Sequence, residues 1–199
     1  MMVKICGITN REDALAAADG GATALGFNFY RLSPRYVEPE TVADIVGALP
    51  ATIWKVGVFV DEPPHRVADL VSRLALDVVQ LHGNETEFPT DIRVWKAARV
   101  TESFDISDLE RCPAEAVLLD AAANGTYGGS GQTFDWHLAR KCSKKVIVAG
   151  GLDDSNVQQA IRQARPWGVD ACSCIESAPG KKDHRRLAAF LNAARAKIV

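Results

Sequence analysis

The sequence predicts an α/β protein of the (β/α)₈ TIM-barrel class, a compact single domain with some trimmed helices. Short apolar runs alternate with helix-like segments along the chain, and there are eight such runs. Several runs are apolar on both faces, as parallel strands are when helices cover one side and a packed interior the other. The expected strands are Val3–Cys6, Ala24–Phe29, Trp54–Val60, Val78–His82, Arg93–Ala97, Ala116–Asp120, Lys145–Ala149 and Val169–Ile175.

The segments between these runs carry the start and stop signals of helices. Capping residues or a proline in the first turn open them, and glycine or proline follows some of them. Thr9 or Asn10, for example, can cap a first helix that ends before Gly20. The expected helices are Arg11–Asp19, Pro39–Leu49, Pro64–Leu74, Asp153–Arg165 and Lys182–Ile198.

The length of 199 residues lies at the lower limit for a closed barrel, so some helices must be short. The connection between His82 and Arg93 predicts a short or irregular fourth helix, because Phe88-Pro89 interrupts it. An open doubly wound sheet is the alternative arrangement of the same elements. No repeat, low-complexity stretch or linker divides the chain, so residues 1–199 are expected to form one domain.

The composition is that of a water-soluble globular protein, with 47% hydrophobic and 24% charged residues and a net charge of -2. This charge gives no reason to expect binding to nucleic acid or to a membrane, which requires a basic surface. The N-terminal residues lack the basic and apolar parts of a secretory signal, so a cytoplasmic location is expected. The expected partner is a small molecule, bound by a monomer or weak homo-oligomer.

The five cysteines are odd in number and scattered, which argues against a framework of disulfides. Cys172 and Cys174 lie two residues apart, but no histidine pair is near them in the sequence, so no metal site is expected. The cysteines are Cys6, Cys112, Cys142, Cys172 and Cys174.

In barrels of this class the active site lies at the C-terminal ends of the strands. Cys6 ends the first strand two residues after Lys4, so both side chains point the same way and the ammonium favours a thiolate, which suits a base. Asp120 ends the sixth strand, where the edge of an apolar barrel favours the protonated carboxyl that a general acid requires. The alternatives are a structural buried thiol for Cys6 and a helix-capping or loop-bracing carboxylate for Asp120.

Gly150 and Gly151 follow the seventh strand and precede Asp153, which opens a helix. Such a backbone can approach an anion closely and direct N–H groups at it. With the end of the eighth strand it predicts a phosphate site, although a tight strand-to-helix turn explains the glycine pair equally well. The glycine-rich run 127–132 has the composition of a loop that closes over a substrate.

His82 differs from the other histidines because it stands at a strand end, which makes it a candidate site residue. The tryptophan and phenylalanine residues are expected in the core. Three histidines in or beside the expected helices should be solvated: His65, His137 and His184.

Several short motifs follow one another in a specific order. They are Lys4–Thr9, Gly26-Phe27 with Ser33–Val37, Val58–Val60, Gln80–Gly83, Leu118–Asp120, Gly128–Gly131 with Phe134–Trp136, Ala149–Leu152 and Pro179–Asp183. Each is modest, but in this order they resemble the phosphoribosylanthranilate isomerase family of tryptophan biosynthesis over essentially the whole chain.

The resemblance implies an Amadori rearrangement of N-(5-phosphoribosyl)anthranilate to 1-(o-carboxyphenylamino)-1-deoxyribulose 5-phosphate, with no metal or organic cofactor. By motif match, Asp120 is the general acid that protonates the furanose ring oxygen, and Cys6 is the general base that removes the C2 proton. Arg35 would meet the carboxylate of the anthranilate, unless it is an exposed loop arginine, and His82 would line the site. Backbone N–H groups would hold the phosphate at Gly150, Gly151, Ser173 and Cys174.

One motif departs from the family, which usually has Ser-Ser-Gly where this chain has Cys172-Ser173-Cys174. The missing glycine adds a side chain where backbone should approach the phosphate. Two other hypotheses stay open on the sequence alone. One is a different barrel of the sugar-phosphate isomerase or epimerase type, and the other is a thiol-redox sensing barrel that pairs Cys172 with Cys174.

Overall fold

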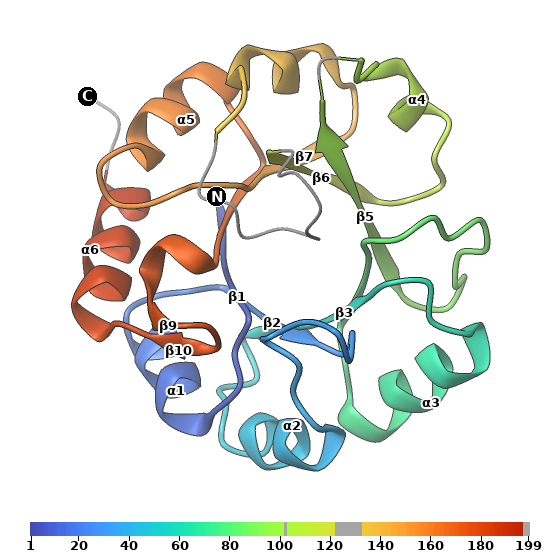
Figure 1. Ribbon diagram of the computed structural model, residues 1–199, viewed down its shortest axis with the longest axis vertical. Helices are drawn as coiled ribbons and strands as arrows, with labels where there is room; N and C mark the ends of the chain where they lie inside the picture. Colours follow the sequence, from blue (N-terminus) through green and yellow to red (C-terminus); the bar gives the residue numbers. More distant parts are fainter. Residues whose placement is uncertain (102, 122–132, 197–199) are drawn as a thin grey trace.

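The computed structural model describes residues 1–101, 103–121 and 133–196 and has the predicted barrel architecture. Eight strands pair in chain order, all in parallel, and β8 pairs with β1 to close the barrel (Figure 1). The alternative of an open doubly wound sheet is therefore wrong. The strands are β1 (Met2–Cys6), β2 (Ala24–Asn28), β3 (Trp54–Phe59), β4 (Val78–Leu81), β5 (Arg93–Val100), β6 (Ala116–Ala121), β7 (Lys145–Val148) and β8 (Gly168–Ala171).

Helices surround the barrel and bury its outer face (Figure 1). They are α1 (Arg11–Asp19), α2 (Pro39–Val46), α3 (Pro64–Leu74), α4 (Ser107–Glu110), α5 (Val157–Ala164) and α6 (His184–Arg195). The structure adds two 3₁₀ turns, η1 (Trp136–Lys141) and η2 (Ser173–Ile175), and a short hairpin of β9 (Glu176–Ala178) and β10 (Lys181–Lys182). In the part of the chain that the structure describes, no helix has the length and apolar character needed to cross a bilayer.

Two helices match the sequence prediction to the residue, and the cause is local. The side chain of Asn10 accepts a hydrogen bond of 2.8 Å from the backbone N–H of Asp13, which caps α1 as expected. Pro64 occupies the first position of α3, where its missing N–H costs nothing.

Two other helices begin later than predicted. The carboxylate of Asp153 accepts hydrogen bonds from the backbone N–H groups of Ser155 and Asn156 and folds them into a turn, so α5 begins only at Val157. Asp183 is the N-cap of α6, so that helix begins at His184, and Lys182 belongs to β10 instead. Helix α2 also ends earlier than predicted, at residue 46.

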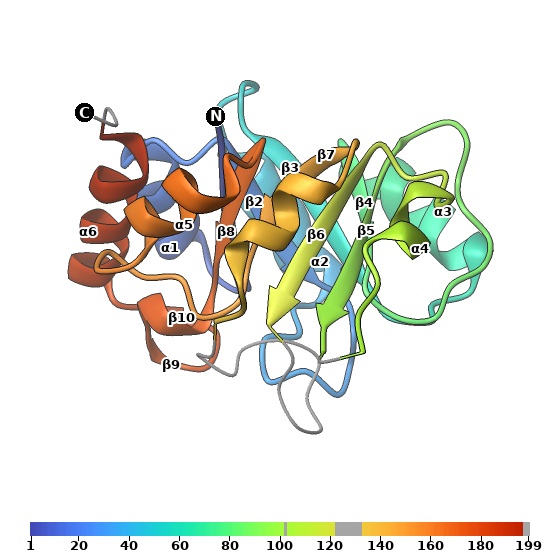
Figure 2. The same ribbon diagram turned by 90° about the horizontal axis from the view of Figure 1, so that it is seen from above.

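The eighth strand is shorter than the apolar run from Val169 to Ile175 that predicted it. It ends at Ala171, and the turn η2 and the β9–β10 hairpin carry the chain back toward the barrel. In Figure 2 the strands β5 and β6 point to the edge at which this hairpin lies, and the N-terminus lies at the opposite edge. The hairpin therefore adds Glu176 and Lys182 to the face formed by the C-terminal strand ends.

No helix forms between β4 and β5, where the sequence predicts a short or irregular one. The carboxylate of Glu85 holds this connection by accepting hydrogen bonds from the backbone N–H of Gly83 and from the Lys96 ammonium, the latter at 2.7 Å. The connection is therefore ordered by side-chain contacts and not by a helix.

The inside of the barrel is apolar toward the N-terminal strand ends and polar toward the C-terminal ends. Trp95 is fully buried among the apolar side chains and packs against Trp54 and Trp167, with ring centroids 6.0 and 5.7 Å away. This apolar cluster consists of Met2, Ala24, Val56, Val78, Trp95, Ala97, Ala116, Leu118, Ile147 and Ala149. The expectation that tryptophan and phenylalanine side chains form the core is confirmed for the fully buried Trp95, Phe27, Phe29, Phe59 and Phe190, whereas Trp54 and Trp167 are partly buried.

The polar layer above is centred on a buried ion pair between the first and last strands. The Lys4 ammonium, 0% exposed, lies 2.9 Å from the Asp170 carboxylate, and the two residues are directly paired in the β1–β8 register. Gly26 on the other neighbouring strand makes room, because a Cβ there would lie 3.1 Å from Lys4 Nζ. The pair thus connects the two strands that close the barrel.

We expect Asp170→Ala to lower the free energy of unfolding by about 3 to 5 kcal/mol, because it leaves the Lys4 ammonium buried without its carboxylate. Denaturant unfolding measures this change. The control is Asp69→Ala, which breaks the exposed Asp69–Arg73 pair of α3 and should cost less than about 1 kcal/mol. Equal losses in the two variants would contradict the central role given to the buried pair.

Candidate active site

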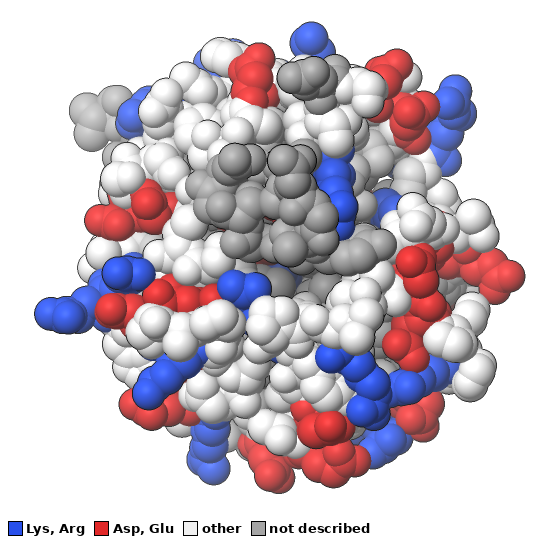
Figure 3. Space-filling model, in the orientation of Figure 1, with Lys and Arg blue, Asp and Glu red and all other residues white. Residues whose placement is uncertain are grey.

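All eight residues predicted for the site line one pocket at the C-terminal ends of the strands. They come from the ends of β1, β4 and β6, from the loop after β2, and from the segments after β7 and β8. Around this face, acidic and basic side chains are interspersed and form no large area of one sign (Figure 3). The predicted residues in this pocket are Cys6, Arg35, His82, Asp120, Gly150, Gly151, Ser173 and Cys174.

Cys6 ends β1 and has the surroundings of a thiolate. The pKa of its thiol lies well below the usual value, because the Cys172 thiol hydrogen-bonds to it and the Lys4 ammonium adds its charge, and together they outweigh the effect of burial. Gly7, with φ of 71°, lets Cys172 approach, since a Cβ there would lie 2.9 Å from the Cys172 sulfur. The influence of Lys4 was expected from strand alternation, but that of Cys172 was not.

Asp120 near the end of β6 has the opposite electrostatic character. Burial and the nearby charge of Cys6 raise the pKa of its carboxyl to about 6. A carboxyl with this pKa holds its proton closer to neutral pH than an ordinary aspartate. The pocket therefore contains one group suited to give a proton and one suited to accept it.

His82 lies just beyond β4, with Nε2 3.8 Å from the Asp120 carboxylate. Burial lowers the pKa of this imidazole to about 4, so the ring is neutral at pH 7. Its Nδ1 lies 3.5 Å from the amide nitrogen of Gln80, two residues earlier on the same strand. The neutral ring can exchange hydrogen bonds beside Asp120 without neutralising its charge.

Arg35, in the loop after β2, is not an exposed loop arginine. Its guanidinium forms a fork with the carboxylate of Glu176, with nitrogen–oxygen distances of 2.7 to 3.0 Å. On the other side, the buried ammonium of Lys182 lies 2.9 Å from the same carboxylate. Glu176 therefore holds two cations at the rim of the pocket.

The segment after β7, which is predicted to hold phosphate, has the left-handed backbone conformation that its two glycines allow. Gly150 and Gly151 have φ values of 78° and 64°, which a residue with a Cβ rarely adopts. A Cβ on Gly150 would also lie 2.6 Å from an oxygen of Asp120, so the turn passes directly over the candidate acid. The side chain of Asn156 fixes this turn by donating a 2.7 Å hydrogen bond to the carbonyl of Gly151.

Ser173 and Cys174 lie on η2, after β8 has ended. Partial burial raises the pKa of the Cys174 thiol, in contrast to Cys6. The alternative hypothesis of a redox barrel pairs Cys172 with Cys174. In the structure, the thiol that interacts with Cys172 is that of Cys6. The predicted loop at 127–132 lies outside the described residues.

The sequence interpretation missed four buried polar residues of this region: Gln80, Asp170, Glu176 and Lys182. Strand alternation could have identified the first two, because Gln80 lies two residues before His82 and Asp170 two before Cys172. The other two depend on the return of the β9–β10 hairpin, which no local pattern indicated.

The other histidines lie away from this pocket. His65 and His137 are exposed, as expected. His184 is 42% exposed, and its Nε2 lies 2.8 Å from the Asp13 carboxylate, so it joins α6 to α1. In the ranges that the structure describes, no group of three or more His, Cys, Asp and Glu side chains is arranged to hold a metal ion.

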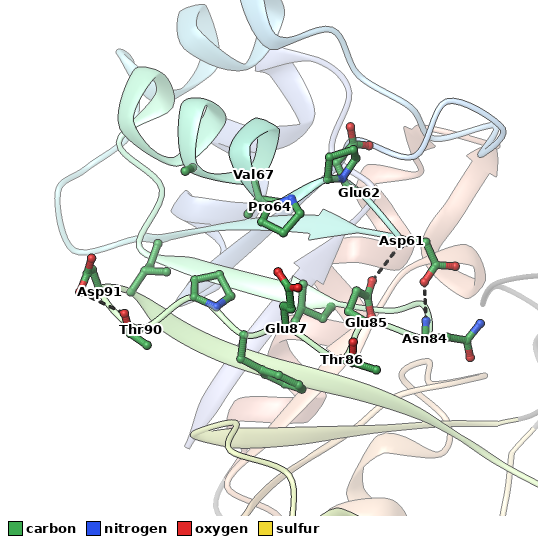
Figure 4. Close-up of a pocket in the computed structure, with 16 residues that line it drawn as sticks. Asp61, Glu62, Pro64, Val67, Asn84, Glu85, Thr86, Glu87, Thr90 and Asp91 are labelled. Atoms are coloured by element: carbon green, nitrogen blue, oxygen red, sulfur yellow. Dashed lines mark hydrogen bonds between the residues drawn. The ribbon is translucent and has the colours of Figure 1, made fainter.

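A larger cavity, of about 630 Å³, lies where a helix between β4 and β5 is missing (Figure 4). Its wall is formed by α3 and by the connection from Asn84 to Ile92. Asp61 and Glu85 at its edge are used in hydrogen bonds to backbone N–H groups, which brace the loops. This cavity has the character of a gap in the helical layer, and the acid/base residues lie in the barrel pocket.

The fold and the pocket define the class of protein, a TIM barrel whose mouth is suited to acid/base chemistry. The sequence matches the family of N-(5'-phosphoribosyl)anthranilate (PRA) isomerase over residues 3–193. The isomerase of Solibacter usitatus is 54% identical over 100% of this chain and 99% of its own, and that of Magnetococcus marinus is 47% identical over 97% and 94%.

Solved structures agree with these relatives. Phosphoribosyl anthranilate isomerase from Thermotoga maritima has a TM-score of 0.90 and 40% identity, with 98% of each chain covered. A second structure, an isomerase in complex with reduced 1-(o-carboxyphenylamino)-1-deoxyribulose 5-phosphate, has a TM-score of 0.85 and 38% identity, again with 98% of each chain covered. The chain belongs to the N-(5'-phosphoribosyl)anthranilate isomerase family, which confirms the family and the isomerase class predicted from its motifs.

The raised pKa of Asp120 predicts a pH-dependent effect of Asp120→Asn on stability. Because the pKa is about 6 in the folded protein against an ordinary 3.8, the fold opposes ionisation, and wild-type stability falls as the pH rises through this range. The free energy of unfolding of the variant, relative to wild type, should therefore rise by about 2 to 3 kcal/mol between pH 4 and pH 7. Urea unfolding at several pH values measures this, and a constant difference would contradict the assigned pKa.

Proposed function

We propose that this chain converts N-(5-phosphoribosyl)anthranilate to 1-(o-carboxyphenylamino)-1-deoxyribulose 5-phosphate in tryptophan biosynthesis, with Asp120 as general acid and Cys6 as general base. The observation that carries the proposal is the opposite shift of two pKa values in one pocket: that of Asp120 upward and that of Cys6 downward. The complex of a 38% identical isomerase with a reduced form of this product supports the choice of substrate.

Asp120 acts first in the proposed reaction. Its carboxyl gives a proton to the furanose ring oxygen as the bond from that oxygen to C1 breaks, which leaves an open-chain iminium ion. The pKa of about 6 makes Asp120 a stronger proton donor than solvent and keeps a usable protonated fraction near neutral pH. Neutral His82, 3.8 Å from this carboxylate, can receive or donate a hydrogen bond as the charge on Asp120 changes.

Cys6 acts second, as a thiolate. It removes the proton from C2, the electron pair of that C–H bond forms a double bond between C1 and C2, and the π pair of the C1–N double bond moves to nitrogen and neutralises it. The resulting enol becomes the ketone when C1 gains a proton and the C2 hydroxyl loses one. The lowered pKa of Cys6 favours the deprotonated form that this step needs. Because the electrons only move within the substrate, the proposed reaction needs no redox cofactor or metal.

The two ends of the substrate are bound by different parts of the pocket in this proposal. The Arg35 guanidinium meets the anthranilate carboxylate, for which its fork with Glu176 supplies a ready orientation. Backbone N–H groups of Gly150 and Gly151 and of Ser173 and Cys174 hold the phosphate. Binding at both ends would keep the sugar between Cys6 and Asp120.

The remaining features of the proposal concern the whole protein. Residues 1–199 form one catalytic domain that acts on a small phosphorylated substrate, in the cytoplasm and without a nucleic-acid or membrane partner. The expected monomer or weak homo-oligomer stays a prediction. One solved relative, from Thermotoga maritima, is described as a dimeric isomerase. Light scattering after gel filtration measures the mass in solution.

The roles of Cys6 and Asp120 are tested by Cys6→Ser and Asp120→Asn. Each should lower kcat by about 10²- to 10⁴-fold, the usual contribution of a general acid or base, with a much smaller change in KM. The substrate is generated in situ and the loss of its fluorescence gives the rate. Cys142→Ser, at the end of η1 outside the pocket, is the matched control. Rates near wild type in both active-site variants would refute the mechanism.

The role of Arg35 is tested by Arg35→Met, with Arg31→Met in the same loop as the control. Because the charged hydrogen bonds to a carboxylate contribute about 1.5 to 3 kcal/mol, KM should rise roughly 10- to 100-fold while kcat changes less. Arg31 is exposed and lies over the ring of Tyr36, so its replacement should leave KM near the wild-type value. An unchanged KM in Arg35→Met would exclude contact with the substrate carboxylate.

A further inference from the structure

Cys6 has a second thiol beside it, which the proposed isomerisation does not use. The register of β1 and β8 pairs Lys4 with Asp170 and Ile5 with Ala171. The residues that follow are Cys6, which ends β1, and Cys172, the first residue after β8. Because paired strands lie about 4.8 Å apart, the two cysteines leave the last paired positions at a separation that a disulfide can span. The two side chains line the same pocket, and each thiol shifts the pKa of the other: that of Cys6 downward and that of Cys172 upward.

Two glycines beside the pair leave space for its two sulfurs. A Cβ on Gly7 would lie 2.9 Å from the Cys172 sulfur, and a Cβ on Gly26 would lie 2.8 Å from the Cys6 sulfur. Both glycines therefore allow the thiols to approach from their two strands. Since the pair lines the pocket, a small oxidant that reaches the pocket reaches the sulfurs.

We propose that Cys6 and Cys172 form a reversible disulfide under hydrogen peroxide, which removes the proposed general base and switches the active site off. The role of the switch rests on the proposed function, whereas formation of the bond does not. Cys6 ends the first strand and Cys172 directly follows the last, so the bond would also join these two ends of the barrel covalently. A disulfide in a protein of the cytoplasm is typically transient and regulatory, which fits a reversible switch.

The chemistry proceeds in two balanced steps. The Cys6 thiolate attacks peroxide, so an S–O bond forms as the O–O bond breaks, and the released hydroxide takes up a proton to leave as water. Cys172 then attacks the sulfur of this sulfenic acid, so the S–S bond forms and a second water leaves. Cys6 and Cys172 together lose two electrons, which peroxide accepts. A dithiol reductant reverses the change by thiol–disulfide exchange.

The charges around the pair favour the second step. While Cys6 is a thiolate, its hydrogen bond and charge raise the pKa of Cys172, which stays protonated and donates. Conversion of Cys6 to a neutral sulfenic acid removes that negative charge. The sulfur of Cys172 then lies between the buried Lys182 ammonium, 3.9 Å away, and an oxygen of Glu176, 3.8 Å away. The ammonium favours the Cys172 thiolate, and the carboxylate can accept the proton that the thiol gives up. Oxidation of the first thiol thus prepares the second to react.

The experiment compares wild type, Cys172→Ser and Cys174→Ser after brief exposure to peroxide, with each activity normalised to that of the same reduced variant. Wild type should lose roughly 100-fold or more of its activity, as expected for loss of a general base, and recover with dithiothreitol. Peptide mapping without reduction should show Cys6 joined to Cys172, with the loss of two hydrogen atoms. Cys174→Ser should lose and regain the same fraction of its own reduced activity as wild type does.

After prolonged exposure to peroxide, Cys172→Ser should lose activity that dithiothreitol does not restore, because Cys6 then has no thiol to resolve its sulfenic acid and is oxidised further to sulfinic acid. If this variant does not fold, Cys172→Ala and the peptide map of wild type decide the question. A disulfide between Cys172 and Cys174, or no disulfide in wild type, would overturn the proposal. Absence of isomerase activity in the reduced wild type would instead contradict the proposed function and leave the mapped bond as a separate result.

Discussion

The buried ion pair between Lys4 and Asp170 is the contact on which the active end of this barrel depends. It joins the first and last strands at the level where the interior changes from apolar to polar. A buried ammonium is costly without its carboxylate, so the pair also favours the one register of β1 and β8 that brings them together. That register sets Cys6 and Cys172 beside each other at the mouth, and it aims the charge of Lys4 at the Cys6 sulfur.

The same ammonium acts on the two titratable groups of the pocket to different effect. It helps to lower the pKa of Cys6, which also has the Cys172 thiol as a hydrogen-bond donor. It acts in the same direction on Asp120, but there burial outweighs it and the pKa is raised to about 6. Hydrogen bonding and desolvation, and not charge alone, therefore separate the two groups. Because the two pKa values are shifted in opposite directions, a single pocket can hold an acid and a base at one pH.

The hairpin after β8 connects this pocket to the rim. Glu176 begins β9 and binds both Arg35 and Lys182, which otherwise would be two neighbouring cations. In the proposed reaction a substrate carboxylate shares Arg35 with Glu176, and in the proposed switch Lys182 stabilises the second thiolate. The rim therefore affects both substrate binding and thiol chemistry through one carboxylate. The departure from the usual Ser-Ser-Gly of the family is what gives this chain a thiol at position 172.

The sequence by itself determined the alternation of strands and helices, the exact bounds of α1 and α3, and a set of strand-end residues that share one pocket. Those features follow from side-chain periodicity, capping and proline positions, which act over a few residues. Only the tertiary structure decided the partners of Lys4 and Arg35, the early end of β8 at Ala171, and the contact of Cys6 with Cys172. Residues such as Lys4 and Asp170, 166 positions apart, meet because the barrel closes in one register, and no local pattern specifies that closure.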